Sequence, residues 1–525
     1  MGFLLGILKV VLKVVCKIAY FCGLCWFLIP MGVGMIAELI TGKALWGGEL
    51  NVISFICDIL WYVCYVLAPM TFIQNIIRTV MKNDFSWIKL IRGKTSKIGN
   101  VAEFNKSDIA LKNKDELSGV VYGKHNGKYV TQPETTDGHA VVIGGAGSGK
   151  TRGIAMPTLI SWKHRAFVID VKGELYEETS NARGKERIKV FNPFDENAYN
   201  YDPYYVFGCA DEISEVALQL ATAIIPMPED VKEPFFITSA QNMLCGFLIY
   251  FYELGEDFSS TMRAIKSVPI KEIIQQIAND NNEKAKMQIM QFVDMDAKTL
   301  SNIFSELSNH ITAFATSDKL QRALSRNGNC ITPNDLENGY DIFCCVPEEM
   351  ITEWKDLMSM MCNQFFKFFE KRKNNNSEPI LFLVDEFPRI GKIQNINSAL
   401  ATLRSKGIHI LLVIQSLSQL SSIYGDKIAE VISDNCSYKA ILRASEPKTQ
   451  KWCSDLVGTY DKKKLSKNFN SDMLGVGKGQ GTSLSTEEKR IINPADFAYL
   501  QDVVCLFPNG YRRIEKIKYG DELVG

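Results

Sequence analysis

The sequence predicts an α/β fold with a buried parallel sheet, preceded by a hairpin of two membrane-spanning helices. After residue 98, short and almost entirely apolar runs alternate with helical stretches, which is typical of strands covered on both faces by helices. Two of these runs end in the residue types that form phosphate and metal sites. Before residue 98, two apolar stretches are each long enough to cross a bilayer.

The membrane hairpin is predicted from two runs with almost no charge. In Ile18–Ile40 the only charged residue is Glu38, and in Val52–Ile73 it is Asp58. Each run has about 22 residues, enough to span the bilayer core as a helix. The short, glycine-rich segment Thr41–Asn51 joins them, so two antiparallel spans are the simplest solution, with one span and an interfacial helix as the alternative. We expect Asp58 near the outer interface; a functional intramembrane carboxylate is the other interpretation.

Basic residues set the expected orientation of this hairpin. Several precede the first span or follow the second, whereas the connecting loop contains only Lys43. The positive-inside rule then places both ends in the cytoplasm and the loop outside. We therefore expect a multi-pass protein of the cell membrane, with the rest of the chain in the cytoplasm. The flanking basic residues are Lys9, Lys13, Lys17, Arg78, Lys82, Lys89, Arg92, Lys94 and Lys97.

The charge of the cytoplasmic part excludes general binding to nucleic acid over a basic face. Residues 1–98 carry ten Lys or Arg and four Asp or Glu, whereas the remainder carries 49 and 55 of the chain's 59 each. Any contact with nucleic acid must therefore be local. The 14 cysteines follow neither a disulfide framework nor zinc-site spacing, which is typical of a reducing cytoplasm.

The predicted strand Ala140–Ile143 leads into a phosphate-binding loop with the pattern G-x-x-x-x-G-K-[ST]. Glycines allow backbone N–H groups to surround phosphates, and the predicted helix Arg152–Trp162 directs its N-terminus at them. We expect Lys150 to contact the β- and γ-phosphates of ATP and Thr151 to bind Mg²⁺. The residues assigned to the nucleotide are Gly144, Gly145, Ala146, Gly147, Ser148, Gly149, Lys150 and Thr151.

An acidic pair follows a second buried strand, Ile380–Val384. We expect Asp385 to hold the Mg²⁺ and Glu386 to activate a water molecule, because two adjacent carboxylates at a strand end do not easily bind one metal. An ordinary pair of acidic residues at a strand end is the alternative.

Two further residues are candidates for the same chemistry. Gln415 follows the predicted strand Ile408–Ile414, so it faces the ligand crevice and is a candidate γ-phosphate sensor; a surface amide is the alternative. Arg404 lies on the predicted helix Asn397–Lys406, which Gly407 ends. It is a candidate for acting on a neighbouring subunit's site, with a solvated arginine as the alternative.

These elements suggest four segments. Residues 1–98 form the membrane hairpin and a basic juxtamembrane segment, and residues 99–257 and 329–525 form the two parts of a nucleotide-binding domain. Residues 258–328 contain no convincing strand and are predicted to be an all-helical insertion. Residues 462–488, rich in Lys, Gly and Ser, are expected to be mobile. The predicted strands are Ala140–Ile143, Ala166–Val171, Ile188–Phe191, Tyr340–Val346, Ile380–Val384, Ile408–Ile414, Lys439–Leu442 and Val503–Phe507.

Between residues 100 and 520 the sequence resembles the conjugative type IV secretion coupling proteins, the TraG-like ATPases. The stretches that carry the resemblance are 119–124 (Gly-Val-Val-Tyr-Gly-Lys), the phosphate loop, 170–175 (Asp-Val-Lys-Gly-Glu-Leu), 191–194 (Phe-Asn-Pro-Phe), 384–388 (Val-Asp-Glu-Phe-Pro), 399–404 (Ala-Leu-Ala-Thr-Leu-Arg), 415–420 (Gln-Ser-Leu-Ser-Gln-Leu) and 492–496 (Ile-Asn-Pro-Ala-Asp). Val171 stands where the family commonly has Pro, and a long acidic C-terminal tail is missing from this sequence.

The resemblance implies a RecA-like P-loop ATPase with a helical domain, assembled as a hexameric ring that brings a relaxase–DNA complex to the secretion channel. The partners it implies are single- or double-stranded DNA, the relaxase, channel proteins, the membrane and further copies of the chain. It assigns the nucleotide to Lys150 and Thr151, the metal to Asp385 and the water to Glu386. It also implies a role across the subunit interface for Arg404 and γ-phosphate sensing for Gln415.

Two other functions compete with this one. A membrane ATP-dependent protease of the zinc type would need H-E-x-x-H, a pattern that none of the five histidines forms. A docking platform whose nucleotide site only assembles the ring, without translocating cargo, is the non-enzymatic alternative. Nucleotide turnover distinguishes it from a motor.

Overall fold

The chain divides into two compact units, residues 1–95 and 96–525, and all the described residues belong to the second unit. The predicted membrane hairpin and its basic flanks therefore lie outside the described residues. Within the described residues, one helix, α9 (Pro234–Glu253), is long and apolar enough to cross a membrane, but 67% of its apolar window is buried inside the fold. The computed structural model describes residues 101–104, 108–228, 231, 233–326, 329–373, 378–469 and 480–518.

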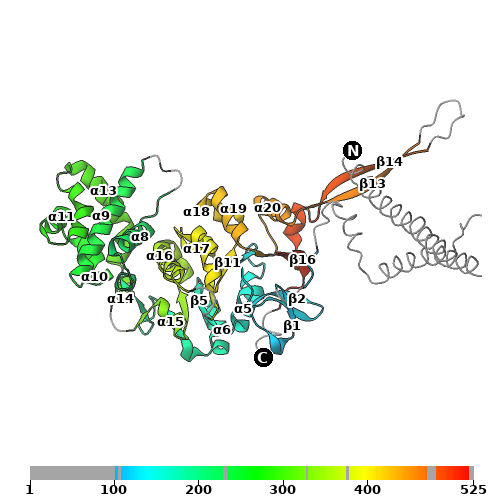
Figure 1. The fold of residues 1–525 in the computed structure, drawn as a ribbon, viewed down its shortest axis with the longest axis horizontal. Helices are drawn as coiled ribbons and strands as arrows, with labels where there is room; N and C mark the ends of the chain where they lie inside the picture. Colours follow the sequence, from blue (N-terminus) through cyan, green and yellow to red (C-terminus); the bar gives the residue numbers. More distant parts are fainter. Residues whose placement is uncertain are drawn as a thin grey trace, which may run out of the picture. The chain divides into compact units, whose positions relative to one another are not determined.

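The unit is built on a mixed sheet of nine strands (Figure 1). From β12 to β6 all neighbouring strands are parallel, whereas β15 and β16 pair antiparallel at one edge. The α/β prediction is confirmed, but the predicted strand at residues 503–507 joins the sheet in the antiparallel direction. In sheet order the strands are β16 (Gly510–Ile514), β15 (Val503–Phe507), β12 (Tyr438–Ile441), β4 (Ala140–Ile143), β11 (Ile408–Ile414), β10 (Ile380–Val384), β5 (Arg165–Asp170), β9 (Asp341–Cys345) and β6 (Ile188–Phe191).

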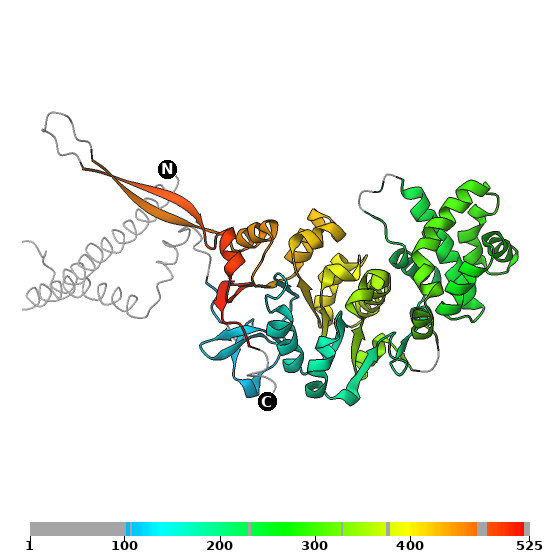
Figure 2. The ribbon, with the colours of Figure 1, turned by 180° about the vertical axis from the view of Figure 1, so that it is seen from behind.

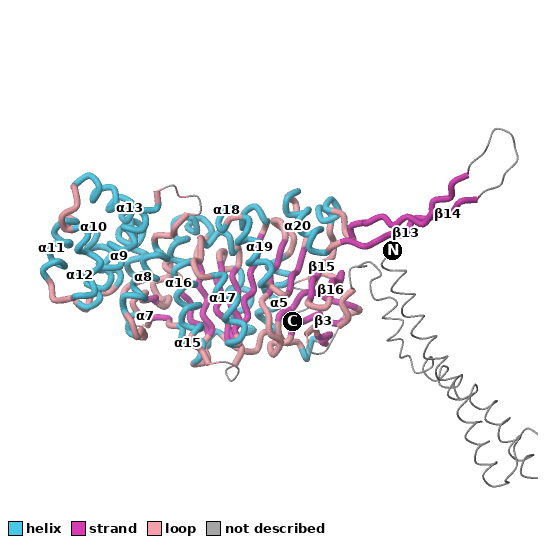
Figure 3. The backbone as a smooth tube through the Cα atoms, turned by 45° about the horizontal axis from the view of Figure 1, so that its top comes forward, coloured by secondary structure: helices cyan, strands magenta, loops and turns pink. Residues whose placement is uncertain are grey.

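Both faces of the sheet are covered, which explains why its central strands are almost entirely apolar. Phe382 packs into one large core with the helices from α16 onward, whereas Leu381 and Leu383 pack into a second core with Leu159 of α5 and Leu175 of α6. The tube in Figure 3 shows helices flanking the strands. The covering helices are α5 (Met156–Ser161), α6 (Glu174–Arg183), α16 (Ile351–Glu370), α17 (Ile396–Thr402), α18 (Leu417–Tyr424), α19 (Asp426–Asn435) and α20 (Pro447–Val457).

Two smaller β-structures flank the main sheet. The strands β1 (Ala110–Lys112), β2 (Val120–His125) and β3 (Lys128–Gln132) form an antiparallel sheet that packs on the second core. The strands β13 (Thr459–Phe469) and β14 (Gln480–Arg490) form a long antiparallel hairpin, seen in orange in Figure 2. The expected mobile segment at 462–488 therefore contains regular strands. The strand pattern is hidden in the sequence because this segment lacks the alternation of apolar and polar residues that predicts a strand.

A helical bundle interrupts the sheet between β6 and β9. Helix α9 packs closely on α12, where a Cβ on Gly246 would lie 2.6 Å from Ile289 Cγ1. The predicted division at residue 258 stays a prediction, although α9 already packs with the helices of the predicted insertion. The helices of this region are α7 (Tyr205–Gly208), α8 (Ile213–Ile224), α9, α10 (Phe258–Ser267), α11 (Ile270–Asn279), α12 (Glu283–Ile289), α13 (Ala297–Thr316), α14 (Asp318–Ala323) and α15 (Pro333–Glu337).

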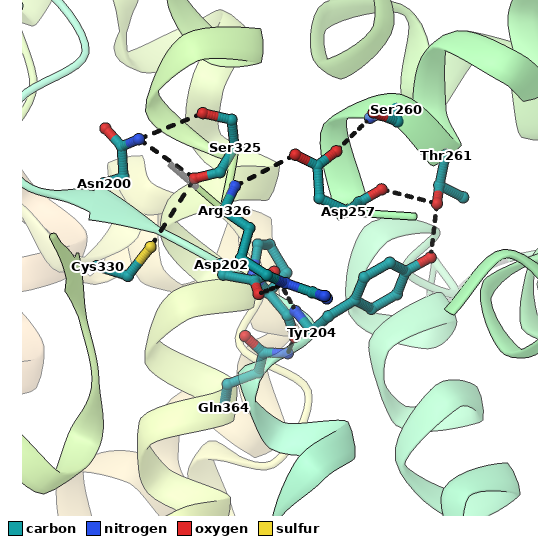
Figure 4. A network of polar contacts seen from close by, with 11 residues as sticks. Asn200, Asp202, Tyr204, Asp257, Ser260, Thr261, Ser325, Arg326, Cys330 and Gln364 are labelled. Atoms are coloured by element: carbon teal, nitrogen blue, oxygen red, sulfur yellow. Dashed lines mark hydrogen bonds and ion pairs between the residues drawn. The ribbon is translucent and has the colours of Figure 1, made fainter. Parts of the chain in front are cut away.

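The connections into and out of this bundle are held together by polar contacts (Figure 4). The short strands β7 (Asn200–Tyr201) and β8 (Cys330–Ile331) pair in parallel. Beside them, Arg326 Nε lies 2.9 Å from Oδ2 of the buried Asp202, and the Tyr204 hydroxyl donates to Thr261 Oγ1 at 2.9 Å. These contacts join the bundle to the sheet at the point where the chain crosses between them.

Candidate functional site

The candidate site lies where four parallel strands end at the same edge of the sheet. In the register, Ile143 of β4 pairs with Ile414 of β11, and Val384 of β10 pairs with Ile169 of β5. The residues that follow these strands therefore emerge side by side, as expected for the ligand-binding edge of an α/β sheet. They are Gly144, Gln415 and Asp385, together with Asp170 at the last position of β5.

The phosphate loop folds as its glycines require. Gly147 and Gly149 have φ angles of 65° and 96°, a region that side chains with a Cβ rarely adopt. The loop continues into a π-helical turn, Thr151–Ala155, and then into α5, so the predicted helix after the loop is present. Such turns concentrate at functional sites. The Gly153 N–H donates to the Gly149 carbonyl at 2.7 Å and closes the turn.

Lys150 lies inside this loop and is only 6% exposed. Its ammonium donates to the Gly145 carbonyl at 3.2 Å, which leaves capacity for further acceptors. Burial lowers the pKa of Lys150, while the carboxylates of Glu386 and Asp385 raise it. A second group in the loop, Ser148 Oγ, is buried and has no hydrogen-bond partner among the described residues. A bound anion in the loop would supply acceptors to both groups.

Asp385 is prepared to bind a cation. Burial, together with the negative charges of Glu386 and Asp170, raises its pKa to about 7, while the positive charge of Lys150 opposes this change. Its Oδ1 atom is buried without a hydrogen-bond partner among the described residues. A divalent cation would offset this electrostatic cost, so Asp385 fits Mg²⁺. Thr151, which follows the loop residue Lys150 in the sequence, is the other residue expected to bind the ion. Among the described residues, no group of three or more His, Cys, Asp or Glu could hold a metal ion. Mg²⁺ commonly binds through one or two carboxylates together with phosphate oxygens.

Glu386 and Gln415 are in direct contact. The Gln415 amide nitrogen lies 2.7 Å from each carboxylate oxygen of Glu386. Glu386 is buried at 6% exposure and has a φ of 51°, one of two positive values among the described residues other than glycine. The Arg389 N–H donates to the Glu386 carbonyl at 2.7 Å and stabilises this turn. This turn directs the Glu386 carboxylate toward Gln415, at the carboxyl end of the neighbouring strand β11.

Comparison with known proteins identifies the family. The family described as Type IV secretory system Conjugative DNA transfer matches residues 90–518. The chain belongs to this family.

Among curated relatives, the protein VirD4 of Agrobacterium fabrum (strain C58 / ATCC 33970) is 23% identical over 433 residues, covering 78% of this chain and 63% of VirD4. The conjugal transfer protein TraG of Escherichia coli is 22% identical over 377 residues, covering 64% of this chain and 56% of TraG. This chain therefore spans less than two thirds of the length of either relative.

The fold is similar to that of the plasmid coupling protein TrwB. The TrwB structure in complex with a non-hydrolysable ATP analogue, ADPNP, has a TM-score of 0.59 at 16% identity, and the match covers 81% of this chain and 97% of TrwB. A TrwB structure with ADP and Mg²⁺ has a TM-score of 0.57 at 16% identity, covering 73% of this chain and 87% of TrwB.

In this member of the conjugative DNA transfer family, Arg404 does not join the other predicted site residues. It lies on η8 (Leu403–Lys406), immediately before β11, and its side chain is exposed. Gly407, with a φ of 70°, ends this turn as predicted. Gln415 lies at the opposite end of the seven-residue β11, so Arg404 and the phosphate loop are separated by about 23 Å of strand.

Sequence reasoning did not assign two residues that the structure brings to the site. Asp170 faces Asp385 from β5, and its carboxylate accepts N–H groups from Gly173 at 2.9 Å and Tyr176 at 2.8 Å. Arg443, after β12, contacts the phosphate loop through both its main chain and its side chain. The stretch 170–175 carries a signal for Asp170, as an acidic residue at the end of a buried strand, whereas Arg443 follows a strand with no motif.

Proposed function

We propose that this chain is a membrane-anchored ATPase that couples a relaxase–DNA substrate to a type IV secretion channel and powers conjugative DNA transfer. The observation that carries the ATPase is the convergence of Lys150, Asp385, Glu386 and Gln415 on one edge of the sheet, next to the phosphate loop. Membership of the conjugative DNA transfer family supports the role in secretion.

The residues suggest a division of labour in ATP hydrolysis. Lys150 balances the charge of the β- and γ-phosphates, and the loop N–H groups bind their oxygens. Thr151 and Asp385 would hold Mg²⁺, which neutralises the charge that develops on the phosphates. Glu386 accepts a proton from the attacking water while the water oxygen bonds to the γ-phosphorus. The bond from that phosphorus to the β,γ-bridging oxygen breaks at the same time, and ADP leaves with the bridging oxygen. Gln415 senses the γ-phosphate, a role supported by its hydrogen bond to Glu386.

The assembly and the partners belong to the same proposal. The placement of Arg404, at the sheet edge opposite its own phosphate loop, supports a role in the site of a neighbouring copy within a hexameric ring. DNA, a relaxase and channel proteins are the partners implied by a coupling role. A VirD4 relative from Bartonella henselae is named a type IV secretion system-coupling protein, and the TraG relative from Rhizobium radiobacter is named a conjugal transfer protein.

Nucleotide turnover by the full chain in detergent or nanodiscs tests the proposal. We expect Mg²⁺-dependent ATP hydrolysis that is stimulated by DNA and lost in Lys150→Ala. ATP binding without turnover, with DNA or without it, would instead establish the docking platform. Turnover unaffected by DNA would support an ATPase and contradict coupling to DNA.

A further inference from the structure

The order of strands around the phosphate loop determines on which side of β4 the sugar and base of a bound nucleotide would lie. The loop follows β4. Gln415, assigned to the γ-phosphate, follows β11, and Glu386, assigned to the attacking water, follows β10; both strands lie on one side of β4. On the other side of β4 lies β12. With the γ-phosphate next to Glu386 and Gln415, the sugar and base must leave the loop away from them, on the β12 side.

Arg443 occupies that side and touches the loop twice. Its carbonyl accepts the Gly145 N–H at 2.8 Å, and its Nη2 donates to the Ala146 carbonyl at 3.2 Å. Nη2 also lies 3.8 Å from where a Cβ on Gly147 would stand, so the guanidinium lies on the surface of the loop. The side chain is exposed, which leaves its planar face accessible to a ligand.

A second cation lies near Arg443. Lys516 follows β16 and is half-buried, and its pKa is lowered by burial and by the positive charge of Arg443. The neighbouring residue Ile517 has its carbonyl oxygen 3.7 Å from the position of a Cβ on Gly153, in the π-helical turn after the loop. The C-terminal segment and Arg443 therefore border the start of this turn on the side away from the carboxylates.

We propose that Arg443 forms the nucleoside subsite of the ATPase, with its guanidinium plane against the purine base. This inference rests on the proposed ATPase function. A guanidinium plane stacks on a base without reading its edges, so it accepts adenine and guanine alike. Structures of TrwB, a protein of similar fold, in complex with analogues of GTP and of ATP agree with a subsite of this kind.

The competing role for the Arg443 side chain is to stabilise the loop by its hydrogen bond to the Ala146 carbonyl. Binding of inorganic tripolyphosphate distinguishes this role from base stacking. Tripolyphosphate occupies the loop but has no base. Calorimetry on the detergent-solubilised full chain should show that Arg443→Ala weakens ATP, GTP and ADP by about tenfold each, the scale of one base stacked on a side chain. Its binding of tripolyphosphate should change by less than about twofold.

Two further variants keep the test interpretable. Arg443→Lys retains a charged donor for the Ala146 carbonyl but loses the plane, so it should also weaken ATP more than tripolyphosphate. Arg263→Ala removes an exposed arginine of α10 in the helical bundle and should leave all four ligands unchanged. Equal losses for ATP and tripolyphosphate, or unchanged ATP binding in folded Arg443 variants, would overturn the subsite. Wild-type protein that binds tripolyphosphate but no nucleotide would overturn it as well, and the ATPase with it.

Discussion

The backbone of Glu386 is held in a conformation that costs a residue with a side chain about 1–3 kcal/mol. This backbone conformation directs the Glu386 carboxylate onto Gln415, next to the phosphate loop. With the extended backbone of a β-strand, the side chain would point in a different direction. Strain of this kind is retained where the geometry of a side chain matters to function. Glu386 is thus the residue whose replacement is most informative about turnover.

We predict that Glu386→Gln binds ATP as the wild type does but hydrolyses it at least about 100-fold more slowly, because only the proton acceptor is lost. Lys150→Ala should instead lose binding and turnover together, since it removes the counter-charge of the phosphates. Fluorescent-nucleotide binding and phosphate release measure the two effects separately. Normal phosphate release by Glu386→Gln would remove this residue from the role of general base.

Two buried histidines, His139 and His409, lie at the amino ends of β4 and β11. Burial lowers the pKa of His139 to about 3 and that of His409 to about 4. The His139 Nδ1 accepts the Ile410 N–H at 3.0 Å, which a protonated ring could not do. In the unfolded chain both rings take up a proton near pH 6.5, whereas in the folded chain they stay neutral.

Stability should therefore be full above about pH 6.5 and fall as the pH decreases toward 4, by up to about 1.4 kcal/mol per pH unit for each histidine. Chemical denaturation at pH 7.5, 6 and 5 measures this slope. His139→Asn, whose side-chain oxygen can replace the Nδ1 acceptor, should have a shallower slope than the wild type. Parallel slopes for the variant and the wild type would show that His139 titrates normally in the folded protein.

At the scale of the element, β11 separates two functions that the sequence places only 11 residues apart. Gln415 leaves its carboxyl end beside Glu386, whereas Arg404 precedes its amino end. A rigid strand buried on both faces cannot bring these ends together. An arginine that completes an ATP site from this position must complete the site of another copy.

This placement predicts complementation between two inactive variants. Arg404→Ala should bind ATP but hydrolyse it poorly, because the neighbouring site loses a positive charge near the transferred phosphate. Mixing it with Lys150→Ala should restore part of the activity, since some interfaces then pair an intact Lys150 with an intact Arg404. Phosphate release by co-purified mixed oligomers is the measurement. Near-normal turnover of Arg404→Ala alone would indicate a solvated arginine, and mixed oligomers without rescue would argue against a shared site.

At the scale of the whole molecule, the proposed motor requires attachment to the membrane with its ATPase unit in the cytoplasm. The uneven distribution of basic residues around the two apolar runs predicts this orientation. It also predicts that the segment Thr41–Asn51 lies outside the cell.

A cysteine at Gly47 should consequently react with a membrane-impermeant maleimide on intact cells, in a background whose native cysteines are first blocked or replaced. A cysteine at Glu272, exposed on α11 in the helical bundle, is the matched internal control and should react only after lysis. The opposite pattern at the two positions would reverse the predicted topology.

The sequence alone determined the features that depend on local pattern. The eight predicted strands are present with ends shifted by at most one residue, because strands buried on both faces are apolar at most positions. The phosphate loop was equally clear, since its glycines, lysine and threonine must be consecutive to surround a phosphate. The hairpin β13–β14 was missed because its sequence lacks the apolar alternation that marks a strand resting on a core.

Only the tertiary structure showed which distant residues meet at the site, because this depends on the order of strands in the sheet. Gln415 and Glu386 are 29 residues apart in sequence and touch because β10 and β11 are parallel neighbours. Arg443 reaches the phosphate loop from 297 residues away because β12 pairs with β4. The spacing of residues along the chain does not predict which strands become neighbours, because strand pairing is established only when distant apolar runs assemble into one sheet. The placement of Arg404 opposite its own site follows from the same topology.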